Sequence, residues 1–198
     1  DFIGNGMYLW HRAMLVSVAD TNGVVKKIVG KLYSIHEEKL QSQELILRAE
    51  RDSLTGVYNH STFVSKVSRF LVEFDETLCA LYMIDLDDFK LVNDALGHYA
   101  GDDLLCDTAV VLESVANTYG GFCGRLGGDE FSMFIPDIVD EDTACMVAKT
   151  LNKGIRAIKC KAEHSASIGI AVDTISKSLK FDSLYYKADQ ALYYSKRQ

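Results

Sequence analysis

Residues 122–135 read FCGRLGGDEFSMFI, two largely apolar runs on either side of a Gly-Gly-Asp turn. The runs FCGRL and EFSMFI contain β-forming residues, and the glycines between them give the backbone the freedom that a tight reversal needs. Pro136, which lacks an N–H, ends the second run. The stretch therefore predicts an antiparallel hairpin that carries two acidic side chains, Asp129 and Glu130, at its tip.

Strands and helices alternate on both sides of this hairpin. The pattern predicts buried strands at Leu78–Asp85 and Ser165–Ala171, and helices at Ser61–Phe74, Phe89–Leu96, Asp102–Asn117, Asp140–Ala157 and Leu184–Lys196. The resulting order, βααββαβ, predicts an α/β fold with a central mixed, mostly antiparallel sheet flanked by helices.

A different pattern precedes this region. Strands are expected at Tyr8–Ala19 and Val24–Tyr33, because the Asn-Gly pair between them is a strong hairpin signal. Residues 35–51 lack Gly and Pro and are rich in good helix formers, which predicts a linker helix. Leu40, Leu47 and Leu54 are seven residues apart and suit a parallel coiled coil. The other seam position is mostly polar, so a plain amphipathic helix is an equal alternative.

The composition limits the possible functions. The chain has 198 residues, 28 of them acidic and 21 basic, for a formal charge of −7. An acidic protein lacks the clustered basic surface that nucleic-acid polymers require, so no such partner is expected. The apolar runs are far shorter than the roughly 20 residues of a membrane span. The five cysteines contain no CxxC pair, which indicates reduced core residues of a cytoplasmic protein. The chain is also expected to be a fragment, and its full-length form could be membrane-anchored.

Three groups of carboxylates fall at the ends of the predicted elements: Asp85, Asp87 and Asp88; Asp102 and Asp103; and Asp129 and Glu130. A helix cap is an alternative role for Asp102, and a turn residue is one for Asp129. Asp85 differs, because a carboxylate directly after LYMI lies at the edge of the core and needs a partner to offset its desolvation. Mg²⁺ binds carboxylate oxygens and leaves positions for phosphate oxygens. Asp85 and the hairpin turn together therefore predict a metal-dependent phosphate site.

The letters GGDEF at 127–131 resemble the signature of the diguanylate cyclase family. Further parts of the family's pattern occur in order: DSLTGVYN at 52–59, DLDDFKLVNDALGHYAGD at 85–102, SIGIA at 167–171 and KADQALYYSK at 187–196. The resemblance covers residues 52–198 and implies a sheet like that of nucleotidyl cyclases and polymerase palms. Residues 1–34 resemble the last strands of a PAS sensory domain, and residues 35–51 resemble the signalling helix that often follows one.

What the resemblance implies is a bacterial enzyme that condenses two GTP molecules into cyclic di-GMP and two pyrophosphates. A homodimer is implied, with one half-site on each subunit. Asp85, Glu130 and the Leu86 carbonyl match the ligands of Mg²⁺, for which Mn²⁺ can substitute. Asp129 matches the acidic residue that helps to ionise the ribose 3′-hydroxyl and assists with the metal. The expected catalytic side chains are thus Asp129, Glu130 and Lys90.

The resemblance also implies the substrate contacts. Asn93 and Asp102 match the pair that reads guanine, which offers an N–H and an amino group side by side where adenine does not. Lys90 and Lys196 match phosphate contacts, since an ammonium group is a compact point charge. The pocket and its entrance would be shaped by Phe89, Leu96 and Gly97, and Gly127 and Gly128 would let the triphosphate approach the backbone.

Some positions depart from the family's pattern. Thr118 and Gly121 stand where an RxxD product-inhibition site would be, so product feedback through that site is not expected. His60 replaces a usual arginine, and Asp88 replaces a histidine or an aromatic residue. One alternative function is an inactive module that binds GTP and regulates a partner, although the turn and the metal aspartate are intact. Another is that the carboxylates serve only as caps and turns.

Overall fold

A computed structural model of the chain describes residues 2–3, 7–74 and 76–197. The chain divides into two compact units, residues 1–49 and residues 50–198. Each unit has its own internal contacts, and the second contains every candidate site residue that the sequence singles out.

The first unit is built on an antiparallel hairpin. Strand β1 (Phe2–Ile3) pairs with β2 (Met7–Tyr8), and β3 (His11–Ala19) pairs with β4 (Val25–Ser34). The predicted hairpin is confirmed, with one difference at its turn. Among the turn residues only Gly23 takes a positive φ, of 80°, and the Asp20 carboxylate accepts hydrogen bonds from the N–H groups of Asn22 and Val24. The turn is thus closed by an Asp side chain as well as by the glycine.

Helix α1 (His36–Glu50) follows the hairpin. Leu40 and Leu47 lie on the helix and are each about half exposed, whereas Leu54 lies beyond its end. The seven-residue spacing therefore covers two helical positions rather than the three that the sequence suggests, because the helix ends before the turn at residues 52–56.

The second unit has a five-stranded mixed sheet with the strand order β5-β7-β8-β6-β9. Its strands are β5 (Tyr58–Asn59), β6 (Leu78–Asp87), β7 (Phe122–Gly127), β8 (Glu130–Ile135) and β9 (Ser165–Thr174). The pairing of β5 with β7 is parallel, and the other three pairings are antiparallel. The predicted α/β fold with a mixed, mostly antiparallel sheet is confirmed.

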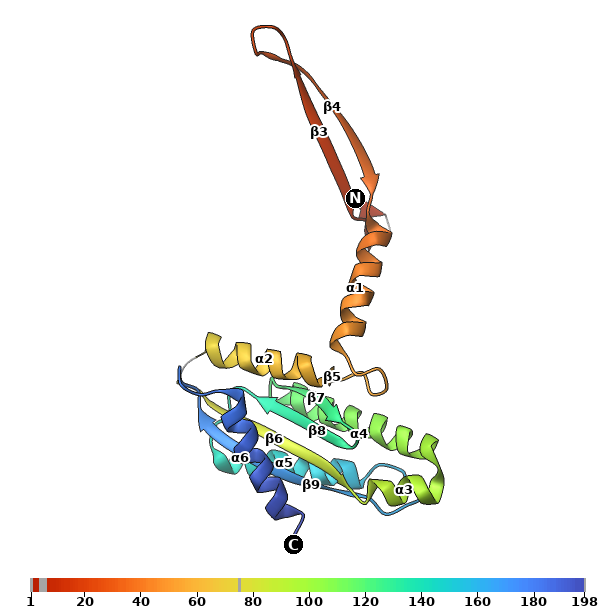
Figure 1. Ribbon diagram of the computed structural model, residues 1–198, viewed down its shortest axis with the longest axis vertical. Helices are drawn as coiled ribbons and strands as arrows, with labels where there is room; N and C mark the ends of the chain where they lie inside the picture. Colours follow the sequence, from red (N-terminus) through yellow and green to blue (C-terminus); the bar gives the residue numbers. More distant parts are fainter. Residues whose placement is uncertain (1, 4–6, 75, 198) are drawn as a thin grey trace. The chain divides into compact units, whose positions relative to one another are not determined.

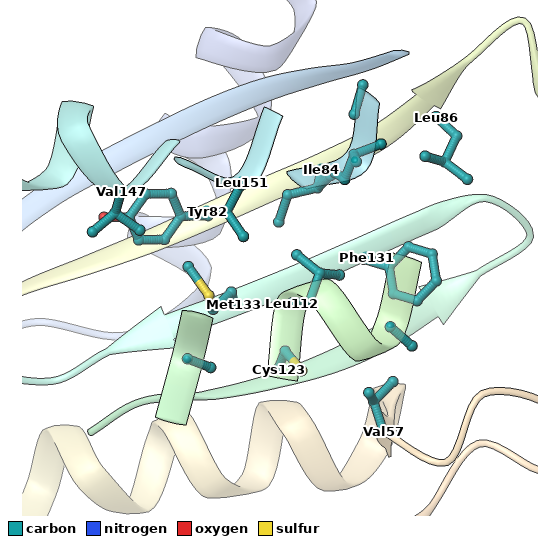
Figure 2. Close-up of a cluster of buried hydrophobic side chains, with 14 of the residues drawn as sticks. Val57, Tyr82, Ile84, Leu86, Leu112, Cys123, Phe131, Met133, Val147 and Leu151 are labelled. Carbon is teal, nitrogen blue, oxygen red and sulfur yellow. The ribbon is translucent and has the colours of Figure 1, made fainter. Parts of the chain in front are cut away.

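Helices α2 (His60–Glu73), α4 (His98–Thr118), α5 (Glu141–Arg156) and α6 (Phe181–Ser195) cover the two faces of this sheet (Figure 1). Helix α3 (Phe89–Leu96) lies beyond the end of β6 and packs against α4. Alternation along β6 assigns the faces: Tyr82 and Ile84 pack with α4 and α5, while Leu81 and Met83 pack with α2 and α6. Figure 2 shows the first of these layers, with side chains of β6 and β8 meeting those of α4 and α5. The central strand is buried on both faces, which explains its nearly continuous apolar sequence.

Two boundaries differ from the sequence prediction near the candidate site. Strand β6 continues to Asp87, two residues beyond its predicted end. Helix α4 begins at His98, and its N-cap is Gly97 with a φ of 85°, so Asp102 lies inside the helix. The alternative role of Asp102 as a helix cap is therefore wrong, because the chain reverses at the glycine instead.

The cysteines are all free. Cys79 and Cys123 are buried, and burial raises the pKa of each thiol to about 12. Cys145 is exposed, so the expectation of core cysteines is wrong for this one. Among the described residues no helix is both long and apolar enough to cross a membrane.

We expect Gly169→Ala to destabilise the second unit by about 1–3 kcal/mol, as overpacking does in a close-packed core. A Cβ at this position of β9 would lie 2.1 Å from the Ala188 carbonyl oxygen and 2.3 Å from the Leu192 nitrogen, both backbone atoms of α6. Urea unfolding would measure the change, with Thr174→Ala, an exposed position on the same strand, as the control. Equal midpoints for the two variants would contradict this close approach of helix and strand.

Candidate active site

The candidate site lies where β6 meets the turn between β7 and β8. Asp85 of β6 stands directly opposite Glu130 of β8 in the antiparallel register. Directly opposed residues project from the same face of a sheet, with Cβ atoms about 4.5–5.5 Å apart. Asp85 follows Leu81 and Met83 at alternate positions, so both carboxylates lie on the face that α6 covers. The pairing thus brings two acidic groups 45 residues apart in sequence to one place.

Asp85 is the buried member of the pair, with 6% of its surface exposed. Burial raises the pKa of Asp85 above its ordinary value, and the charges of Asp129 and Asp87 add to this effect. The Lys196 ammonium group acts in the opposite direction, from 2.7 Å away. A carboxylate in this setting favours a nearby cation, because a positive charge lowers the cost of its ionised form.

The turn residues are oriented by backbone contacts. The N–H of Leu86 donates to the carbonyl oxygen of Asp129 at 3.4 Å. In an antiparallel strand the N–H and C=O of one residue point to the same neighbour. The Leu86 carbonyl is therefore on the side of the Gly-Gly-Asp turn, where the side chain of Asp129 is half-buried and that of Glu130 is exposed.

The Arg125 side chain binds the backbone of this turn. Its Nε and Nη2 atoms donate to the Gly128 carbonyl oxygen at 2.9 and 2.6 Å, and its Nη1 atom donates to the Asp52 carboxylate at 3.1 Å. Gly128 has a φ of 53°, a conformation that glycine adopts without strain. The guanidinium group thus links the turn to the segment where the second unit begins.

The Asp52 carboxylate accepts hydrogen bonds from Thr55 as well as from Arg125. Burial acts to raise its pKa, but hydrogen bonds from Thr55 and the charge of Arg125 outweigh that effect, so the pKa of Asp52 lies below its ordinary value. Sequence reasoning gave Asp52 and Arg125 no role, because the two residues are 73 positions apart and nothing in local spacing connects them.

The predicted guanine-reading residues meet at the corner between α3 and α4. Asn93 is on α3 and Asp102 is in the second turn of α4. A Cβ at Gly101 would lie 2.0 Å from the Asn93 Oδ1 atom and 3.1 Å from the Phe89 ring. Asn93 and Phe89 therefore pack against the first part of α4, next to Asp102. Only glycine at position 101 leaves room for this contact.

The remaining predicted residues lie at the surface of the same region. Leu96, Gly97 and Lys90 are exposed. Within the described residues Lys90 forms no ion pair, whereas Lys196 is engaged by Asp85. The structure thus brings Lys196 to the carboxylates at the end of β6.

The donor set fits a small divalent cation. No three side chains of His, Cys, Asp or Glu are grouped to hold a metal ion in the part of the chain that the structure describes. Asp85 and one further carboxylate, supplemented by the Leu86 carbonyl, would instead leave several positions open. Mg²⁺ binds in this way, through one or two carboxylates with water and phosphate oxygens as its other ligands.

The sequence model of the family described as "Diguanylate cyclase, GGDEF domain" matches residues 49–198, the whole of the second unit. The chain belongs to this family. Its GGDEF letters are the turn between β7 and β8, so the family's signature coincides with the place where the acidic groups gather.

Curated relatives carry two kinds of name. Diguanylate cyclase DgcM of Escherichia coli K12 is 32% identical over 172 residues, covering 83% of this chain and 40% of DgcM. The cyclic di-GMP phosphodiesterase PdeB of Shewanella oneidensis is 32% identical over 159 residues, covering 79% of this chain and 18% of PdeB. The chain spans less than half the length of these relatives. Relatives of this domain thus include proteins named for the synthesis of cyclic di-GMP and for its hydrolysis.

Solved structures show the same architecture. The coiled coil and GGDEF domain of DgcB from Caulobacter crescentus, in complex with c-di-GMP, superposes with a TM-score of 0.71 at 29% identity, covering 82% of this chain and 88% of that one. Diguanylate cyclase SiaD from Pseudomonas aeruginosa, in complex with its activator SiaC, gives a TM-score of 0.68 at 28% identity, covering 81% and 64%.

Asp85→Asn should stabilise the metal-free GGDEF domain, because an amide avoids the desolvation cost of the buried carboxylate. A gain of ~1 kcal/mol corresponds to a Tm higher by about 2–4 °C at this size. The cost of Asp85 is fully present above its raised pKa, so the difference should vanish as the pH falls below the ordinary value of 3.8. Thermal unfolding with a chelator measures it, and Asp94→Asn, exposed on α3, is the control. A lower Tm for Asp85→Asn would contradict the electrostatic account.

Arg125→Lys should lower the free energy of unfolding by about 1.5–3 kcal/mol, the usual range for hydrogen bonds to charged groups. Lysine keeps the charge but lacks the planar guanidinium group whose several N–H donors reach both Gly128 and Asp52. The part due to Asp52 is present above pH 3.8 and is lost as the pH falls through its lowered pKa. Arg69→Lys, which alters an exposed pair with Glu73 on α2, should change stability by less than about 0.5 kcal/mol. Equal losses for the two variants in urea unfolding would refute the role of Arg125.

Proposed function

We propose that the chain is a diguanylate cyclase that condenses two GTP molecules into cyclic di-GMP and two pyrophosphates. The observation that carries the proposal is the pairing of Asp85 with Glu130 beside an intact GGDEF turn, with the Leu86 carbonyl facing the same turn. Family membership agrees with this function. A regulatory module without catalysis would not need to retain a buried carboxylate that raises the cost of folding.

A divalent cation, Mg²⁺ or Mn²⁺, would be held by Asp85, Glu130 and the Leu86 carbonyl, with assistance from Asp129. When bound, it would neutralise negative charge on the triphosphate. Lys196 now pairs with Asp85 at 2.7 Å, and it would turn toward the phosphates once Asp85 has another cation. Lys90, exposed at the start of α3, would supply a second positive charge to the phosphates.

Guanine would bind at the corner of α3 and α4. The Asp102 carboxylate would accept hydrogen bonds from the N1–H and the amino group of guanine, and Asn93 would contact the same base edge. Phe89 would line the purine pocket, with Leu96 and Gly97 at its entrance. Gly127 and Gly128 are exposed, and a Cβ on either would meet open space, so the turn leaves room for phosphate groups.

The reaction would be a nucleotidyl transfer. The ribose 3′-oxygen of one GTP attacks the α-phosphorus of the other, a P–O bond to the 3′-oxygen forms, and the bond to the β-phosphate oxygen breaks to release pyrophosphate. Asp129 would accept the 3′-hydroxyl proton. Because each half-site holds one GTP, two subunits must face each other, and positioning lowers much of the barrier.

The first unit would control that encounter. Residues 1–34 would be the end of a PAS-like sensory domain, and residues 35–51 a signalling helix whose exposed Leu40 and Leu47 allow pairing between two chains. Pairing raises the effective concentration of the second half-site. Product feedback through an RxxD site would be absent, since Thr118 and Gly121 offer neither a guanidinium nor a carboxylate. The enzyme would act in the bacterial cytoplasm.

Incubation with GTP and Mg²⁺ tests the function, with cyclic di-GMP detected by chromatography and mass. The chain should form cyclic di-GMP, with a specific activity that rises with protein concentration, and Asp129→Ala should reduce turnover by about 10²–10⁴-fold. Asp94→Asn serves as the control. Tight GTP binding without product would favour a regulatory module instead. Equal turnover by Asp129→Ala would refute the role given to that residue.

A further inference from the structure

Asp87, the last residue of β6, is bound by two serine hydroxyls of the neighbouring strand β9. The Ser165 Oγ atom donates to its Oδ2 atom at 2.5 Å, and the Ser167 Oγ atom donates to its Oδ1 atom at 2.7 Å. Both carboxylate oxygens therefore have partners inside the protein. Asp87 differs in this from Asp85, whose carboxylate forms an ion pair with Lys196 at the end of α6.

The strand register makes this arrangement possible. Asp87 lies opposite Ser165, and Asp85 lies opposite Ser167, in the antiparallel pairing of β6 with β9. All four side chains project from the same face of the sheet. The hydroxyl of Ser167 reaches diagonally to Asp87, so the two serines hold one carboxylate from two positions along β9.

The contacts of Asp87 also affect Leu86, the residue between the two aspartates. Backbone groups of β6 alternate in direction, so those of Asp85 and Asp87 face β9 while those of Leu86 face β8. The Leu86 N–H does point that way, to the Asp129 carbonyl oxygen. Immediately after Asp87 the strand ends, and Asp88 takes a left-handed conformation with a φ of 53°. The side-chain contacts of Asp87 therefore reinforce the backbone pairing with β9 at the last position before the chain turns away.

We propose that Asp87, Ser165 and Ser167 form a clamp that fixes the end of β6 and thereby aims the Leu86 carbonyl and the Asp85 carboxylate at the divalent cation. The inference rests on the proposed function, for which that cation is required. Asp87 then acts as a positioning residue, since each of its oxygens accepts a hydrogen bond from a serine of β9. Partners of metal ligands commonly contribute 10–100-fold to metal affinity or activity.

The clamp also accounts for the polar residues at the start of β9. Ser165 and Ser167 begin a strand whose next two positions on the same face are Gly169 and Ala171, and Ser167 has only 9% of its surface exposed. A buried hydroxyl needs a hydrogen-bond partner, and the Asp87 carboxylate supplies one for each serine.

The test measures Mn²⁺ binding directly, by electron paramagnetic resonance on the full chain with a non-hydrolysable GTP analogue, alongside steady-state kinetics. The double variant Ser165→Ala/Ser167→Ala should bind Mn²⁺ about 10–100-fold more weakly and lose kcat by a similar factor, with KM for GTP at saturating metal changed less than about threefold. Ser167→Thr in place of alanine, which restores one hydroxyl on a strand, should recover part of the affinity.

Ser176→Ala, just beyond the other end of β9, is the matched control and should bind Mn²⁺ like the wild type. Asp87→Asn provides a second variant of nearly unchanged shape, which should show the same loss of affinity. A folded double variant with wild-type Mn²⁺ affinity would overturn the clamp, and so would a wild-type chain that binds no Mn²⁺ with the analogue. A wild-type chain that binds Mn²⁺ but forms no cyclic di-GMP would refute the proposed function alone, because the affinity comparison would still decide the clamp.

Discussion

The site depends on the antiparallel register of the central strand β6 with its two neighbours. This register places Asp85 opposite Glu130 on one side and opposite Ser167 on the other. A shift of one residue would turn every side chain of β6 to the other face and bury the aspartates under α4 and α5. The apolar residues that alternate along β6 prevent that shift, since Tyr82 and Ile84 pack on one face and Leu81 and Met83 on the other. The hydrophobic core therefore determines where the charged groups emerge.

The functional groups occupy the end of the sheet, where packing gives way to polar contacts. Burial raises the pKa of Asp85, and this cost is tolerated beside Lys196. Asp87 is stabilised instead by the serines of β9, and the Gly128 carbonyl by Arg125. The partners in these contacts come from β7, from β9 and from the end of α6. A site built from several elements in this way holds its atoms more firmly than a single loop could.

Two aspartates separated by one residue have different surroundings. Asp85 forms an ion pair with Lys196 and lies opposite Glu130, next to the GGDEF turn. Each carboxylate oxygen of Asp87 accepts a hydrogen bond from a serine hydroxyl. Spacing in the sequence places the two on the same face of one strand, and only the surrounding elements give them different partners.

The sequence by itself determined the hairpin at 122–135 and the order of the longer strands and helices, because these follow from local periodicity and from the glycines of one turn. It missed the two-residue strand β5, and it singled out the acidic groups at the ends of the elements as candidates. The resemblance to the family also paired Asn93 with Asp102, although the start of α4 at Gly97 was missed, since a positive φ at one glycine leaves no trace in the hydrophobic pattern. Only the tertiary structure decided that Arg125 joins Asp52 to the turn, that Lys196 reaches Asp85, and that Ser165 and Ser167 hold Asp87. These contacts link residues 73–111 positions apart, and such pairings arise from the packing of the whole sheet and not from any property of the local chain.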